Sequence, residues 1–126
     1  MNLADKISNS ELEIMKILWQ QESPVSFTEI RKRLQALKSW DKSTINTLVR
    51  RLSQKGVISS QKLDILYYSP NITFSDYSDF QRRSLIDKLY SGSAKKLVAS
   101  LCERGELTGE DIDEIKRAFN ARQVSE

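Results

Sequence analysis

Apolar residues recur at intervals of three and four positions through the first part of the chain. This period is typical of helices that bury one face, and it predicts three helices at about 8–21, 26–38 and 42–55. The buried faces are expected to consist of Leu12, Met15, Leu18 and Trp19 in the first helix, Phe27, Ile30, Leu34 and Leu37 in the second, and Ile45, Leu48, Val49 and Leu52 in the third.

Helix starts are marked by capping signals. Ser8–Glu11 and Ser26–Glu29 match the capping box, and Thr108–Asp111 repeats this pattern near the C-terminus. Asp41 is expected to cap the third helix, and Gly56 is expected to end it in a left-handed conformation. The agreement between these signals and the apolar period makes the helical interpretation firm.

Two short β-rich runs follow, at 57–62 and 65–69, and predict a hairpin. Leu63 and Asp64 lie between the runs, and Pro70 ends the second one. Three helices followed by a hairpin is the plan of the winged helix-turn-helix, in which the third helix is the recognition helix and the hairpin is the wing. The alternative is a small α+β domain with no role in binding nucleic acid.

Beyond Pro70 the pattern predicts three more amphipathic helices. The expected fold class is therefore mainly α with a small β-hairpin: a winged-helix DNA-binding domain over 1–71 and a three-helix dimerisation region over 72–126. About fifty residues bury apolar faces poorly on their own, so we expect pairing with a second copy rather than folding back on the winged domain. The expected dimer contacts are Leu85, Ile86, Leu89, Tyr90, Leu97, Val98, Leu101, Ile112, Ile115 and Phe119.

The third helix has a second, polar face. From position 42 to position 55 the chain carries four basic residues and no acidic one, whereas ordinary solvated helix faces mix Glu with Lys. Such a face suits the major groove of DNA, where Asn46 could pair with an adenine edge and Thr44 or Thr47 could contact a thymine methyl. The candidate DNA-binding residues are Lys42, Ser43, Thr44, Asn46, Thr47, Arg50, Arg51 and Lys55, with Lys62 on the wing.

The distribution of charge supports DNA binding, and the composition argues against an enzyme or a metal site. The net charge is +3, and residues 1–70 hold 11 Lys/Arg against 7 Asp/Glu, so the basic excess lies in the predicted DNA-binding part. Histidine is absent and Cys102 is the single cysteine, which leaves no Cys–His nucleophile and no zinc site. We therefore expect no enzyme, cofactor or metal, and Cys102 is expected to be a small core residue. No signal peptide or membrane-spanning stretch is recognised, so a cytoplasmic location is expected.

Several segments resemble the BlaI/MecI family of bacterial penicillinase and methicillin-resistance repressors. They are I-S-N-S-E-L-E-I-M-K-I-L-W at 7–19, W-D-K-S-T-I-N-T-L-V-R-R-L at 40–52, K-G-V-I at 55–58, Y-Y-S at 67–69 and L-T-G-E-D-I-D-E-I at 107–115. The resemblance implies a homodimer that binds a double-stranded palindromic operator and represses β-lactam resistance genes. It also implies release by a sensor-linked protease that cuts the C-terminal region.

This chain departs from the family pattern at three places. The position that matches the family's Asn–Phe cleavage site is Ser100 followed by Leu101, and Ser43 and Asn46 replace longer basic residues of the methicillin repressor. The lone Cys102 does not match the Cys-x-Cys cluster of the copper-responsive relatives. Whether a protease cuts at Ser100–Leu101, and which operator sequence is bound, therefore stay open. The alternative function is a winged-helix protein-interaction module without specific DNA binding.

Overall fold

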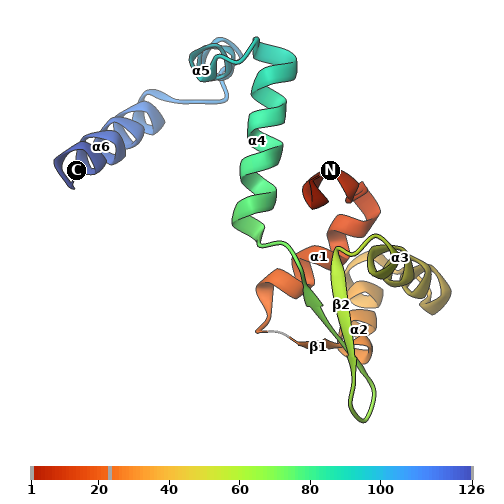
Figure 1. Cartoon of the computed structure of the whole chain (residues 1–126). Helices are drawn as coiled ribbons and strands as arrows, with labels where there is room; N and C mark the ends of the chain where they lie inside the picture. The colour runs from red at the N-terminus through yellow and green to blue at the C-terminus, as the bar shows by residue number, and fades with distance from the viewer. Residues whose placement is uncertain (1, 23, 126) are drawn as a thin grey trace. The chain divides into compact units, whose positions relative to one another are not determined.

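The computed structural model describes residues 2–22 and 24–125 of the chain. Within them the contacts divide the chain into two units, one extending to Gln81 and the other starting at Arg82. The sequence placed a boundary at 71/72, whereas the first turns of the fourth helix belong to the first unit. The elements in Figure 1 are η1 Leu3–Lys6, α1 Asn9–Gln20, β1 Val25–Ser26, α2 Phe27–Lys38, α3 Lys42–Gln54, β2 Ile58–Lys62, β3 Leu66–Pro70, α4 Phe74–Tyr90, α5 Ala94–Glu103 and α6 Gly109–Ser125.

The helices begin at the capping residues that the sequence indicates. The Ser8 hydroxyl accepts a hydrogen bond from the Glu11 N–H at 3.2 Å, and the Glu11 carboxylate accepts one from the Ser8 N–H at 3.0 Å. Ser26 and Asp41 likewise accept bonds from backbone N–H groups in the first turns of α2 and α3. Thr108–Asp111 forms a second reciprocal pair at the start of α6. These bonds satisfy N–H groups that a helix start would otherwise leave unpaired.

The core of the first unit lies between α1, α2, α3 and the sheet. Met15, Leu18, Ile30, Leu34 and the apolar stripe of α3 are buried, as predicted, while Leu12, Trp19 and Phe27 pack at the edge. The prediction for Leu37 is wrong, since this side chain is 73% exposed. Leu37 lies in the last turn of α2, beyond the turns that reach the core. The spacing of apolar residues shows which face of a helix is apolar, but it does not show how far along the helix that face is covered.

The hairpin is part of a three-stranded antiparallel sheet with strand order β1-β3-β2. The predicted strands β2 and β3 pair with Ser60 opposite Tyr68, and residues 63–65 connect them. The sequence did not predict β1, whose Val25 and Ser26 pair with Tyr68 and Tyr67. Because β1 lies between α1 and α2, this pairing ties the wing to the helices.

The second unit buries little of its apolar surface. Among residues 82–122, whose side chains the structure describes, only Ile86 of α4 is buried. The other stripe residues of α4, α5 and α6 in this unit stay half-exposed or exposed. Cys102 is also exposed, which corrects the expectation that it is a small core residue. No helix within 2–22 and 24–125 combines the length and the apolar character needed to cross a bilayer.

Candidate nucleic-acid interface

The interface is built on α3, whose two faces are separated by burial. Ile45, Leu48, Val49 and Leu52 pack in the core, and each is at most 6% exposed. The remaining side chains of the helix therefore point away from the core because of the helical period. A single helix with one buried stripe can offer its opposite face to a large partner.

The end of α3 has a fixed geometry. Gly56 adopts a left-handed conformation with a φ of 77°, and its N–H donates to the Ser53 carbonyl at 3.1 Å. The Val57 N–H donates to the Leu52 carbonyl at 3.0 Å. These two bonds form a Schellman motif, which turns the chain directly from the helix into β2. The predicted role of Gly56 as the left-handed cap is confirmed.

The predicted contact residues of α3 share one solvent-facing surface, apart from Lys55. Thr47 is half-buried and the others are exposed: Lys42, Ser43, Thr44, Asn46, Arg50 and Arg51. No ion pair among the described residues engages Lys42, Arg50 or Arg51, and no carboxylate lies on α3 itself. We call these seven residues the α3 polar face. Its cations are available to an anionic partner such as the phosphates of DNA.

Two hydroxyl groups of the α3 polar face are already bonded within the helix. Ser43 Oγ donates to Asp41 Oδ1 at 2.9 Å, and Thr47 Oγ1 donates to the Ser43 carbonyl at 2.9 Å. The backbone N–H of Thr44 and the Ser43 hydroxyl hold the pKa of Asp41 below its usual range, so this cap is charged near neutral pH. The Asn46 amide has no such internal partner among the described residues. The donors and the acceptor of this amide are therefore available to a partner.

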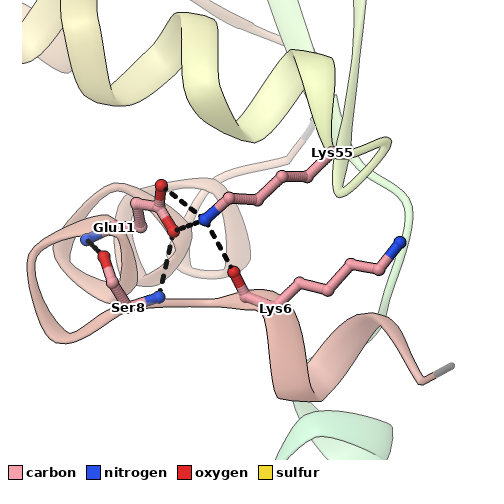
Figure 2. A network of polar contacts seen from close by, with 4 residues as sticks. All are labelled: Lys6, Ser8, Glu11 and Lys55. Carbon is pink, nitrogen blue, oxygen red and sulfur yellow. Dashed lines mark hydrogen bonds and ion pairs between the residues drawn. The ribbon is translucent and has the colours of Figure 1, made fainter.

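Lys55 differs from the other predicted phosphate contacts because its ammonium is already bonded within the first unit. Figure 2 shows its ammonium between the Glu11 carboxylate and the Lys6 carbonyl, and Nζ donates to Glu11 Oε1 at 2.7 Å and Oε2 at 2.9 Å. A third bond, at 2.9 Å, reaches the carbonyl of Lys6. An ammonium has three N–H donors, and these contacts use all of them. The charge pattern of the sequence could not show this, because the partner lies 44 residues away.

The wing presents a single candidate contact. Lys62 is exposed at the end of β2, beside the connection that the sequence indicated. Its neighbours at the tip are the exposed apolar residues Leu63, Ile65 and Leu66 and the exposed carboxylate of Asp64. A phosphate contact from the wing therefore depends on one lysine.

Trp19 supports the start of α4 in a way that the sequence did not reveal. Its indole N–H donates to the Ile72 carbonyl at 2.9 Å, and its ring lies 5.4 Å from Phe74 and 5.3 Å from Tyr77 between centroids. Aromatic pairs at these distances are attractive. The spacing of Trp19 indicated only a core position, since a contact 53 residues away leaves no local signal.

Three helices, a three-stranded sheet with a wing and a recognition helix without carboxylates define a winged-helix DNA-binding protein. A family model described as "Penicillinase repressor" matches residues 7–121. The chain therefore belongs to the penicillinase repressor family. Its relatives are transcriptional repressors with a DNA-binding fold, which confirms the expectation of a regulator rather than an enzyme.

Curated relatives match over most of their length. The penicillinase repressor of Bacillus licheniformis is 34% identical over 116 residues, which is 91% of this chain and 90% of that protein. The methicillin resistance regulatory protein MecI of Staphylococcus aureus (strain N315) is 31% identical over 122 residues, covering 96% of this chain and 98% of the relative. The resemblance inferred from the sequence motifs is thereby confirmed.

Solved structures match the winged part. The solution structure of the DNA-binding domain of the repressor BlaI has a TM-score of 0.54 and 37% identity, covering 61% of this chain and 94% of that one. The structure of monomeric Bacillus licheniformis BlaI in complex with the blaP half-operator has a TM-score of 0.51 and 39% identity, covering 56% and 87%. The predicted fold class, mainly α with a winged helix-turn-helix, is confirmed.

Proposed function

We propose that this protein is a cytoplasmic, homodimeric repressor that binds a palindromic operator and controls β-lactam resistance or a related response operon. The observation that carries the proposal is the α3 polar face, which combines unpaired cations with an uncommitted amide and lacks any carboxylate. The family membership supports it, as does the half-operator complex of the BlaI relative. In this function, repression follows from occupying DNA that the polymerase needs.

Two recognition helices, one from each protomer, enter successive major grooves of the palindrome. Arg50, Arg51, Lys42 and Lys62 neutralise phosphates and release counterions, so the affinity falls steeply with salt. Asn46 supplies the base contact, and a good contact of this kind discriminates by about 1–3 kcal/mol against the wrong base. Phosphate contacts fix the register, and the amide then gives the sequence preference.

Dimerisation uses the apolar surface of the second unit. Leu89 is 66% exposed, Ile115 50% and Phe119 58%, although all three are large apolar residues. A chain of this size gains from covering such side chains with a second copy, because each buried CH₂ contributes about 0.8 kcal/mol. Of the stripe residues that the sequence assigned to the dimer, Ile86 is buried within the chain and must be left out, and the others remain half-exposed or exposed.

Release of the operator would follow from damage to the second unit by a sensor-linked protease. The position that matches the family's cleavage site, Ser100–Leu101, lies inside α5 and not in a loop. The Tyr90 hydroxyl donates to Ser100 Oγ at 3.3 Å, which ties this part of α5 to the end of α4. A protease needs an extended substrate, so cutting here requires α5 to open locally first.

The test is fluorescence anisotropy with the DNA upstream of the protein's own gene and with a scrambled duplex, from about 50 to 200 mM salt. Tight binding that depends on the palindrome and weakens in Arg51→Ala supports the proposal. Arg117→Ala in α6 is the matched control, since it also removes one exposed arginine but lies in the second unit. Equal, salt-independent and weak binding to both duplexes would favour the alternative, a protein-interaction module.

A further inference from the structure

Glu11 is the only polar or charged side chain that is buried among the described residues. It lies in the first turn of α1 and is 1% exposed. Its capping bond to the Ser8 N–H uses one carboxylate oxygen and would work equally well at the surface. The capping role therefore does not explain the burial of a charge.

The buried carboxylate faces the end of the recognition helix. Lys55 follows α3 directly, and its Nζ holds both oxygens of Glu11 as well as the carbonyl of Lys6 at the end of η1 (Figure 2). Three segments thus meet at one ammonium: η1, the start of α1 and the end of α3. Because the Schellman motif fixes the backbone at Gly56, a constraint on Lys55 is also a constraint on α3.

Such a pair is a costly way to gain stability. Removing the Glu11 carboxylate from water is unfavourable, although the Lys55 side chain stays 36% exposed. Apolar residues of similar volume can often replace a buried ion pair at no loss of stability. Burial acts to raise the pKa of Glu11, but the bonds from Lys55 and the Ser8 N–H outweigh it and hold the pKa below the ordinary value. The carboxylate is therefore charged at neutral pH. What the pair adds over apolar packing is direction, because its bonds form only in one geometry.

We propose that Glu11 and Lys55 are positioning residues for operator recognition. They fix the axial position and rotation of α3 against α1, so that Asn46 and its neighbours on the polar face meet the base edges in one register. Contacts to bases require the side chains to be positioned within about 0.5 Å. Nonspecific contacts to phosphates do not require this precision. This inference rests on the proposed function as a sequence-specific repressor.

The test replaces the pair without emptying the site. In the double variant Glu11→Gln/Lys55→Met, Gln keeps an oxygen for the Ser8 N–H and Met keeps the length of the lysine stem. Glu11→Gln alone is the milder variant and is expected to act in the same direction. The matched control is Glu13→Gln/Lys38→Met, which removes the partly exposed ion pairs of Glu13 with Lys38 of α2, at 3.4 Å, and with Lys16 of α1, at 3.0 Å.

Three quantities are measured for each variant: the ratio of affinities for the palindromic and scrambled duplexes, the salt slope, and amide exchange by NMR. We expect the double variant to lose on the order of 2- to 30-fold in the affinity ratio. Its binding to scrambled DNA and its salt slope should equal those of the wild type. Faster amide exchange should be confined to α3 and η1, and the control should change none of these.

Two results overturn the inference. An equal loss of affinity for both duplexes, with a salt slope reduced by about 1, would show that Lys55 is a phosphate contact after all. An unchanged ratio with unchanged exchange in α3 would show that the pair positions nothing. If the wild type itself does not distinguish the duplexes, the proposed function fails, and the exchange in α3 alone decides whether the pair positions this helix.

Discussion

At the scale of single residues, the α3 polar face divides into groups that are already bonded and groups that are not. The hydroxyls of Ser43 and Thr47 donate within the helix, whereas the Asn46 amide and the Arg50 guanidinium have no partner among the described residues. A group that is already hydrogen-bonded within the protein must break that bond before it can bond a base, whereas an unbonded group need not. Specificity is therefore expected to be concentrated at Asn46, while the arginines supply affinity that is independent of sequence.

Asn46→Ala is expected to weaken binding to the operator by about 1–3 kcal/mol, roughly 5- to 150-fold, because one pair of base contacts is lost. Binding to scrambled DNA and the melting temperature should not change, since the side chain is exposed. Anisotropy titrations with both duplexes at one salt concentration measure this. A loss of the same size on scrambled DNA would place Asn46 among the backbone contacts instead.

Glu11 links stability to pH. Its pKa in the folded protein is lowered from the ordinary value of 4.5, so the unfolded chain binds more protons in the acid range. The stabilisation is therefore complete above pH 4.5 and is lost as the pH falls through the folded pKa. In urea unfolding between about pH 3 and 6, Glu11→Gln should flatten this fall. An unchanged slope would mean that Glu11 titrates normally.

At the scale of elements, the sequence predicts the features that depend on residues close to one another along the chain, such as helix caps and apolar helix faces. The caps at Ser8, Ser26 and Asp41 and the stripe of α3 follow from spacing alone, because a helix brings residues three and four apart together. The two-residue strand β1 is too short to show a period and forms only because β3 offers a partner. The ion pair of Lys55 likewise depends on tertiary contact, so it was not predictable.

Gly56→Ala is expected to destabilise the first unit by about 1–2 kcal/mol, because an L-residue is strained at a φ of 77°. An added Cβ meets nothing within 4 Å, so the cost is one of backbone conformation and not of collision. Gly109→Ala is the control, since it also meets nothing within 4 Å and its φ is not positive. Urea unfolding should separate the two, and equal stabilities would contradict the role of Gly56 as the helix end.

At the scale of the whole molecule, charge and apolar surface are divided between two regions. The first 70 residues carry the positive excess and a closed core, whereas the second unit buries only Ile86 among residues 82–122. A basic surface without dimerisation would give weak binding, and joining two such surfaces raises affinity through effective concentration. The exposed stripe is thus expected to set the strength of operator binding without contacting DNA.

Ile115→Ser/Phe119→Ser tests this division directly. Both side chains are exposed on α6, so the variant removes apolar surface without disturbing a core of the single chain. We expect monomers in sedimentation at concentrations where the wild type is dimeric. Affinity for the full palindrome should fall by about 10²- to 10⁴-fold, the gain that linking two sites provides. Affinity for a half-site duplex should stay the same, because α3 is untouched.

The control is Asp113→Ser/Arg117→Ser, which introduces the same residue type on the same helix at exposed positions outside the apolar stripe. It should remain dimeric and bind the palindrome as the wild type does. If the stripe variant also remains dimeric, these side chains are not the interface, and folding back on the winged unit becomes the better account of α6. If the stripe variant is monomeric but binds the palindrome with wild-type affinity, each protomer binds its half-site independently. Dimerisation then does not increase the affinity for the operator.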